Sequence, residues 1–310
     1  MKEAIEKLLT EQLQTWEMAK ANYDALATVR VKELDVNGWL YKVQFNPARI
    51  VSSAAKVDSK SIQERKCFLC PANLPTVQKG LPFGGHYSIL VNPFPIFPKH
   101  LTIPETEHVD QRIKVRFGDM LQLAKELEEY TIFYNGPKCG ASAPDHAHFQ
   151  AGSKGFLPIE KEWQYKKAGR IASYKEATLW YLNDSVRATL IIESEEKEAA
   201  KFLFNAIYDA LELKPEEAEP MMNVLAWYEE SKWITCIFPR DKHRPSCYFA
   251  EGDKNILLSP ASVDMGGVFI TPLEKDFEKI TATDIANILS EVCISSNSFL
   301  RLRQLIKERL

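Results

Sequence analysis

The stretch Gly140-Ala-Ser-Ala-Pro-Asp-His-Ala-His-Phe-Gln150 carries His146, His148 and Gln150 at alternating positions after a run of small residues. Alternation is the period of a β-strand, so the three side chains are expected on one face of a single strand. Two imidazoles and a carboxamide in one row are costly unless a metal, a phosphate or water satisfies them. The backbone N–H groups of the small residues can approach an anion closely. The stretch therefore predicts a histidine nucleophile beside an anion-binding loop.

His148 is the central member of this row and the best candidate for the nucleophile. A histidine that attacks phosphorus must be neutral and held in one tautomer, and an ordinary pKa of about 6.5 leaves it largely neutral at pH 7. Gln150 can donate its amide to a phosphate oxygen. The alternative, a polar sheet edge without chemistry, is less favoured because the small-residue loop and Gln150 accompany the His-x-His pattern.

Length and composition are those of a globular protein with one large domain or two ordinary ones. The 310 residues are 45% apolar and 26% charged, and the net charge of −3 favours neither nucleic acid nor an anionic membrane as a partner. No apolar run approaches the roughly 20 residues of a membrane helix, and the N-terminus begins a helix instead of a signal peptide. Six cysteines do not indicate a disulfide framework, so a cytoplasmic location is expected.

Periodicity predicts a mixture of helices and strands along the first half. A helix is expected over residues 3–26, followed by a hairpin of residues 27–36 and 39–45 that turns at Asn37-Gly38. Residues 46–86 look irregular. The remaining predictions are strands at 87–92, 100–104, 131–135 and 146–151, with a helix at 109–129.

The second half repeats these ingredients more loosely. Strands followed by helices without strict βαβ alternation argue for an α+β fold with antiparallel sheets. The domain boundary is expected between residues 155 and 190, giving halves of 1–170 and 171–310. The predicted elements are strands at 178–182, 187–192, 222–228, 233–239, 256–259 and 267–271, a helix at 195–213, and two short closing helices, the first opened by Thr281.

Cys67-x-x-Cys70 is a spacing that lets two thiolates hold one Zn²⁺ from a tight turn. A tetrahedral site needs two more ligands, and the chain has no second Cys-x-x-Cys, so histidines must supply them. His146, His108 and His100 are the candidates. The alternative is a pair of ordinary reduced cysteines in a loop. A redox role fits less well because no thioredoxin-like pattern surrounds the pair.

Residues 239–245 place four basic or imidazole side chains within five positions after an apolar strand. Arg240, Lys242 and Arg244 are candidates to meet a phosphate, although a solvated loop is the alternative. Asp264 could pair with a ribose, a sugar or one of these basic residues. The sequence lacks a Gly-x-x-x-x-Gly-Lys-Ser/Thr loop, a Gly-x-Gly-x-x-Gly fingerprint and a Gly-x-Ser-x-Gly elbow.

The pattern Asp145-His-Ala-His-Phe-Gln150 resembles the His-x-His-x-Gln strand of the histidine-triad superfamily, in its nucleotidyltransferase branch. That branch includes galactose-1-phosphate uridylyltransferases, diadenosine tetraphosphate phosphorylases and GDP-hexose phosphorylases. Residues 92–95 and 100–108, the Asn135-Gly136 pair and the cysteine pair are also similar to it. The resemblance covers residues 67–152 closely and the second half in outline. Asp145 before the first histidine matches the GDP-hexose phosphorylases better than the uridylyltransferases.

The resemblance implies a duplicated histidine-triad-like fold with two antiparallel sheets and flanking helices. It implies His148 and Gln150 as catalytic residues, with a second, degenerate half that lacks them. Zinc, in a structural role, would be held by Cys67, Cys70, His108 and His146. The third ligand of the family maps to His108 and not to His100. The substrate-binding residues expected from the motifs and the resemblance are Asn92, Asn135, Gly140, Ala141, Ser142, Arg240, Lys242 and Arg244.

The expected activity is nucleotidyl transfer by double displacement through a covalent nucleotidyl-histidine. The substrate would be a nucleoside diphosphate sugar or a dinucleoside polyphosphate, and the acceptor phosphate or a sugar phosphate. A histidine-triad hydrolase and a non-catalytic, zinc-stabilised nucleotide-binding protein are the alternatives. A homodimer is possible in this branch, with Trp16 or Trp180 as candidate interface residues.

Overall fold

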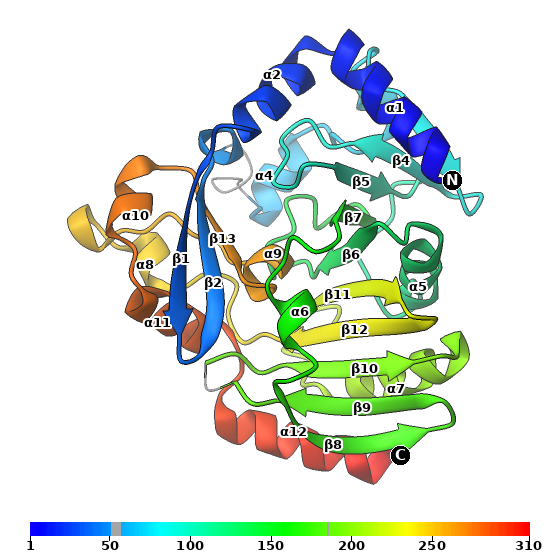
Figure 1. The fold of residues 1–310 in the computed structure, drawn as a ribbon, viewed down its shortest axis with the longest axis vertical. Coiled ribbons are helices and arrows are strands. Elements are labelled where there is room, and N and C mark those ends of the chain that lie inside the picture. The colour runs from blue at the N-terminus through cyan, green and yellow to red at the C-terminus, as the bar shows by residue number, and fades with distance from the viewer. Residues whose placement is uncertain (51–56, 185) are drawn as a thin grey trace.

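A ten-stranded, fully antiparallel sheet runs through the molecule (Figure 1). The computed structural model describes residues 1–50, 57–184 and 186–310. In spatial order the strands are β3 (Gly80–Phe83), β4 (Tyr87–Val91), β5 (His100–Pro104), β7 (His148–Ser153), β6 (Tyr130–Asn135), β11 (Met222–Glu229), β12 (Lys232–Pro239), β10 (Leu190–Ser194), β9 (Ala177–Leu182) and β8 (Lys167–Tyr174).

The large sheet consists of two five-stranded halves that meet where β6 pairs with β11. Each half carries a helix between its third strand in sequence and the strand at the centre: α5 (Phe117–Glu126) and α7 (Lys197–Ala210). The predicted α+β class with two sheets and flanking helices is confirmed. The sheets of the two halves are joined edge to edge, however, because the Asn223–Asn135 to Ala226–Ile132 register continues the ladder between them.

A second, three-stranded sheet pairs a segment of the N-terminal part of the chain with a segment of the C-terminal part. It contains β1 (Arg30–Val36), β2 (Trp39–Phe45) and β13 (Val268–Thr271), and β13 runs parallel to β2. The predicted hairpin is confirmed: Asn37 and Gly38 have φ of 55° and 80°, the left-handed values that a tight hairpin turn requires. The predicted division at residue 170 falls inside β8 and stays a prediction.

Apolar residues are buried on both faces of the large sheet, which places two cores around it. Helices α5, α7 and α12 (Ser296–Arg309) pack on one face. The small sheet and α11 (Ala282–Val292) pack on the other. The remaining helices are α1 (Lys2–Thr15), α2 (Glu17–Leu26), α4 (Ser59–Glu64), α6 (Ile159–Glu162), α8 (Ser246–Phe249), α9 (Ser262–Met265) and α10 (Glu274–Lys279), with short 3₁₀ turns at Pro47–Arg49, Pro71–Asn73 and Gly252–Lys254.

Some predicted elements differ from the structure. The helix expected at 3–26 breaks at Trp16, which has extended backbone angles (φ −115°, ψ 93°) and separates α1 from α2. Residues 256–259 form no strand: the Ile256 N–H donates to the Cys247 carbonyl oxygen and the Leu257 N–H to the Asp276 side chain, so neither joins a strand ladder. The helix expected at 109–129 is shortened to α5. Thr281 does open α11, where its hydroxyl and Asp284 form a capping box.

On the face toward the small sheet, the two halves carry different residues. β7 presents His148 and Gln150 there, whereas β12 presents the buried Ile234, Cys236 and Phe238. Side chains of β2 and Arg187 fill the space over β12: the Arg187 guanidinium lies 4.7 Å from the Trp39 ring and 5.7 Å from the Phe238 ring. Arg187 is itself paired with Asp184 at 2.9 Å. This place in the second half is therefore occupied by side chains, and the predicted degenerate half stays a prediction.

A buried carboxyl gives the fold an expected pH dependence. Glu219 accepts hydrogen bonds from Tyr134 and from the Ile113 N–H at 2.9 Å, and burial raises its pKa from 4.5 to about 7. The folded state therefore holds more protons than the unfolded state between about pH 4.5 and 7, so this group's contribution to stability falls as pH rises through that range.

We expect Glu219→Gln to make the free energy of unfolding less dependent on pH. The decrease that Glu219 causes between pH 4.5 and 7, on the order of 2 to 3 kcal/mol, should be lost. Urea unfolding at several pH values measures this slope of the free energy against pH. Glu212→Gln, at an exposed position nearby, is the control and should leave the slope unchanged. An unchanged slope in Glu219→Gln would contradict the raised pKa.

Candidate active site and metal cluster

A cavity of about 720 Å³ opens beside the first residues of β7. Its walls come from β4, β5, β6 and β7, the loop before β7, α9 and the break between α1 and α2. Six residues expected at a substrate site line it: Asn92, Asn135, Gly140, Ser142, His148 and Gln150. Ala141, Arg240, Lys242 and Arg244 are not among the lining residues.

The ring of His148 is held in one tautomer. Its Nδ1 lies 2.8 Å from the carbonyl oxygen of His146, and since a carbonyl can only accept, Nδ1 carries the proton. The lone pair is therefore on Nε2, for which the described residues provide no hydrogen-bond partner. Burial lowers the pKa of His148 to about 4, so the ring is neutral at pH 7. A neutral imidazole with a free Nε2 in a cavity wall is what nucleophilic attack requires.

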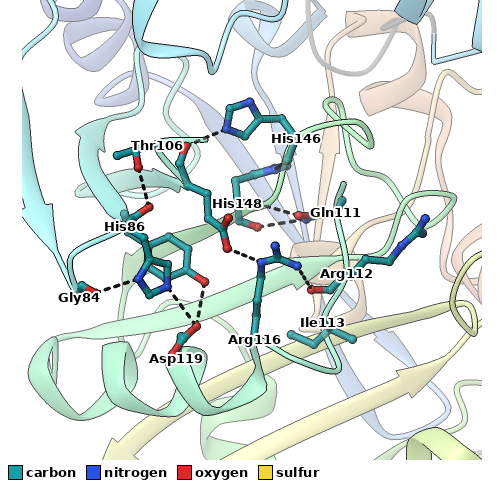
Figure 2. A network of polar contacts seen from close by, with 12 residues as sticks. Gly84, His86, Thr106, Gln111, Arg112, Ile113, Arg116, Asp119, His146 and His148 are labelled. Atoms are coloured by element: carbon teal, nitrogen blue, oxygen red, sulfur yellow. Dashed lines mark hydrogen bonds and ion pairs between the residues drawn. The ribbon is translucent and has the colours of Figure 1, made fainter. Parts of the chain in front are cut away.

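Gln111 fixes the backbone of this residue (Figure 2). Its Oε1 accepts the His148 N–H at 2.8 Å, and its Nε2 donates to the carbonyl oxygens of His148 and Asn135, both at 3.1 Å. The backbone pairing of β6 with β7 ends at Phe133 and Gln150. The Gln111 carboxamide bridges the two strands just beyond that point. Sequence reasoning missed Gln111 because it lies in an irregular segment without a motif.

His146 does not share the strand of His148, which corrects the prediction of a three-residue row. β7 begins at His148, and His146 lies in the preceding loop. Its Nε2 donates to the carbonyl oxygen of Glu105 at 2.8 Å, so its Nδ1 points to Cys67 at 3.3 Å and Cys70 at 3.6 Å. The loop turns the first histidine of the pattern toward the cysteine pair and leaves the second facing the cavity.

Four side chains converge on one point: Cys67, Cys70, His108 and His146, with ligand atoms all within 4.8 Å of one another. The His108 Nδ1 lies 3.1 Å from the Cys70 sulfur. Burial is the largest single effect on the Cys67 thiol and raises its pKa, but the hydrogen bond with His146, those with the backbone of Leu69 and Cys70 and the charge of His146 together outweigh burial and bring the pKa to about 6. The predicted set of two sulfurs and two imidazoles is thus brought together, and this donor set suits a tetrahedral metal ion.

Asp145 supports this cluster from outside. Its Oδ2 lies 3.7 Å from the His108 Nε2, and its Oδ1 accepts from Arg65 at 2.9 Å. Carboxylates in this position commonly orient histidine ligands through the ring nitrogen that faces away from the metal. Arg65 also lines the cavity, so the cluster and the cavity share a wall.

Asn135, at the end of β6, and Gly140, in the loop before β7, shape a further part of the cavity wall. The Oδ1 of Asn135 accepts from the Ser262 N–H at 2.8 Å, the Ser262 hydroxyl at 2.6 Å and the Asn223 amide at 3.0 Å. Because all three groups are donors, the Asn135 atom that faces Ser262 and Asn223 is the amide oxygen. Gly140 has φ of 91°, and a Cβ there would lie 2.5 Å from the Cβ of Ala261. Glycine therefore lets the loop pack against the segment before α9.

The basic segment after β12 does not reach the cavity. Arg240 is buried, and its five N–H donors are used by the carbonyl oxygens of Val292, Pro260, Lys242 and His243 and by the Asn223 side chain. Lys242 pairs with Glu291 at 3.1 Å, and Arg244 donates to Ser259. The geometry gives no support to phosphate binding by these three. Through Asn223, Arg240 instead supports Asn135.

Three further residues line the cavity: Arg49, which was not singled out from the sequence, Asp264, for which several partners were open, and Trp16, which was considered for an interface. Arg49 donates to the carbonyl oxygen of Phe94 at 2.8 Å, and burial lowers its pKa to about 10. Burial raises the pKa of Asp264, the residue left unassigned above, to about 7. Trp16 is 6% exposed and lines the cavity, which argues against the interface role considered for it. No local pattern marks these residues, since all three reach the cavity through tertiary packing.

Comparisons with known proteins agree with this architecture. Residues 8–153 match a family model described as a domain of unknown function, DUF4922, and residues 179–310 match the GDPGP1-like C-terminal domain. Diadenosine 5′,5‴-P1,P4-tetraphosphate phosphorylase 2 of Saccharomyces cerevisiae is 32% identical over 124 residues, which are 36% of this chain. The match spans 38% of that relative's length.

Solved structures of a yeast enzyme share the fold. Yeast Ap4A phosphorylase Apa2 in complex with AMP has a TM-score of 0.59 at 18% identity, covering 92% of this chain and 97% of its own. The same protein with Ap4A has a TM-score of 0.55 at 17% identity, covering 90% and 97%.

The chain thus shares with the yeast Ap4A phosphorylase structures a fold that, here, consists of two five-stranded halves joined in one sheet. The comparisons confirm the resemblance to the phosphorylase and nucleotidyltransferase branch of the histidine-triad superfamily. Within the described residues, no helix has the length and apolar character needed to cross a membrane.

Proposed function

We propose that this chain is a nucleotidyltransferase that forms a covalent nucleotidyl-histidine on His148. The observation that carries the proposal is the His148 ring, whose Nδ1–H is tied to the His146 carbonyl while Nε2 is free at the cavity wall. The matches to an Ap4A phosphorylase and to a GDPGP1-like domain support the same class of activity.

In the first step the Nε2 lone pair of His148 attacks the α-phosphorus of the substrate. A P–N bond forms, and the bond from that phosphorus to the bridging oxygen breaks, so the leaving phosphate departs with the electron pair. In the second step an oxygen of the acceptor attacks the same phosphorus and the P–N bond breaks. Because there are two successive displacements, the anionic acceptor attacks the phosphorus from the side that the first leaving group has vacated.

Neighbouring groups would stabilise the phosphoryl oxygens during both steps. Gln150 and Asn135 offer side-chain amides, and the loop at Gly140 and Ser142 offers backbone N–H groups. Arg49 is a cation in the same cavity and would pair with a further phosphate of the substrate. It takes the role that the sequence assigned to Arg240, Lys242 and Arg244.

We propose that the four-residue cluster holds Zn²⁺. Cys67, Cys70, His108 and His146 would complete a tetrahedral shell with no open position, so the ion would be structural. Its effect on chemistry would be indirect. It would fix His146, whose carbonyl oxygen orients the His148 ring.

The substrate is proposed to be a nucleoside diphosphate sugar or a dinucleoside polyphosphate, with inorganic phosphate as the acceptor. The yeast protein of similar fold was solved with AMP and with Ap4A, which supports a nucleotide in this cavity. A sugar phosphate is the second possible acceptor. A cytoplasmic location and a homodimer also stay predictions.

The test is incubation with a panel of nucleoside diphosphate sugars and diadenosine polyphosphates, with and without phosphate, followed by mass analysis of products and protein. We expect a nucleoside diphosphate as a phosphate-dependent product, and protein heavier by one nucleotidyl group, a nucleoside monophosphate less one water, when phosphate is omitted. Release of nucleoside monophosphate regardless of phosphate would indicate a hydrolase instead. Binding without turnover would indicate a non-catalytic nucleotide-binding protein.

A further inference from the structure

The oxygen of the Gln150 carboxamide lies beside His100, a histidine that does not line the cavity. His100 Nε2 lies 3.0 Å from Gln150 Oε1, and the Asn92 amide approaches the same oxygen at 3.5 Å. His100 is fully buried and does not line the cavity, whereas Gln150 does. The β5–β7 register places the two residues on adjacent strands, with Gln150 opposite Thr102.

The direction of the His100–Gln150 hydrogen bond follows from the other ring nitrogen. The backbone N–H of Ile96 donates to His100 Nδ1 at 3.1 Å, so Nδ1 must be an acceptor and the proton of a neutral ring is on Nε2. Burial, followed by the charge of Arg49, lowers the pKa of His100 to about 3. The ring is therefore neutral, and its Nε2–H donates to Gln150 Oε1.

This bond determines which end of the Gln150 amide faces a substrate. An amide that accepts through its oxygen from His100 presents its NH₂ group in the other direction. We propose that His100 is a positioning residue that holds Gln150 as a hydrogen-bond donor toward the transferred phosphoryl group. The proposal rests on the proposed function, and it concerns a residue that does not touch the substrate.

The surroundings of His100 keep its ring fixed. The Phe97 ring packs edge-on at 5.4 Å, and the Phe133 ring lies at 5.8 Å. The Tyr23 hydroxyl from α2 donates to the His100 carbonyl at 3.0 Å and accepts its N–H at 3.3 Å. A rigid donor of this kind loses little free energy to reorganisation when charge develops on a phosphoryl oxygen. The same packing would also suit a histidine with only a structural role, so the test must separate the two.

The test compares His100→Phe, Gln150→Ala and the double variant. We expect His100→Phe to lower kcat by about 10- to 100-fold with a smaller change in KM, as for other residues that orient a reacting group. Against Gln150→Ala, the same substitution should change kcat less than about 3-fold, because the group that it positions is already absent. His100→Gln should retain more activity than His100→Phe, since a glutamine amide can donate to the same oxygen. Thermal unfolding verifies that each variant is folded.

A second kinetic readout is the rate ratio of the two α-phosphorothioate diastereomers of the substrate. A fixed donor distinguishes the two non-bridging positions, so this ratio should move toward one in His100→Phe and Gln150→Ala alike. Equal fold losses from His100→Phe in both backgrounds, or an unchanged diastereomer ratio, would overturn the positioning role and leave a structural one.

A measurement without turnover separates this proposal from the proposed function. The Gln150 side-chain amide resonances in ¹⁵N-labelled protein can be assigned by their loss in Gln150→Ala. We expect them to shift in His100→Phe and to respond to added AMP in the unsubstituted protein. If the protein forms no nucleotidyl-histidine but these shifts appear, the proposed function fails and the orientation of Gln150 stands. If the shifts are absent, the orientation fails whatever the activity.

Discussion

Replacement of His148 by alanine is expected to remove nucleotidyl transfer, with kcat lower by on the order of 10⁴-fold or more. The physical reason is that the described cavity provides no second imidazole that could replace the lost nucleophile. Without it, an anionic acceptor must approach a phosphoryl group that is itself anionic. Steady-state rates with phosphate as acceptor, together with mass analysis of the protein, measure the loss.

Two further variants sharpen this prediction. His148→Gly should regain part of its activity with added imidazole, which can occupy the space of the missing ring. His86→Ala is the matched control, because His86 is half exposed and its Nδ1 donates to the Gly84 carbonyl away from the cavity. Its kcat should stay within a factor of two of the unsubstituted protein. Phosphate-dependent turnover by His148→Ala at a comparable rate would refute the covalent mechanism.

Metal removal should impair both stability and activity. Treatment with a strong chelator, or Cys67→Ser, is expected to lower Tm by several degrees and transfer activity by about 10- to 100-fold. The cluster joins the loop around residues 67–70 to His108 and His146, and His146 provides the carbonyl that orients the nucleophile. Losing the metal would therefore loosen the residue that fixes the His148 tautomer.

Metal content by mass spectrometry, Tm and kcat should be followed together in this experiment, and Zn²⁺ should restore all three after chelation. Cys247→Ser provides the control, since its thiol lies outside the cluster and is only partly buried. A protein purified without metal that has full activity and is indifferent to chelators would exclude the structural zinc.

Local patterns predicted most of what lies close together in sequence. Asn37-Gly38 set the hairpin, because only residues that accept positive φ fit that turn. The Cys67-x-x-Cys70 spacing indicated a metal site, whereas its distant partners His108 and His146, which the structure brings together with the two cysteines, were singled out only by the family resemblance. A strict motif, a short spacing or a turn depends on a few neighbouring residues, so it can be recognised from the sequence alone.

Features that depend on distant contacts were not predictable in this way. A basic segment next to a strand can bind phosphate or bury its charge, and only the carbonyl oxygens around Arg240 decide between the two. The break at Trp16 interrupts an apolar period that looks continuous. His100 was weighed as a metal ligand, yet its ring is directed to Gln150 by an amide four residues earlier. The contacts that these residues make in the folded protein determine their roles.

The pairing of β13 with β2 has a consequence for biosynthesis. Ser262, which holds Asn135, follows it by 127 residues in the chain, and Pro260, which holds Arg240, follows β12; both precede β13. A nascent chain that has emerged only as far as β12 has its nucleophile and its cysteine pair, but Asn135 still lacks the two donors from Ser262. Catalytic competence would thus arrive only after the ribosome has delivered the segment that holds Asn135 in place.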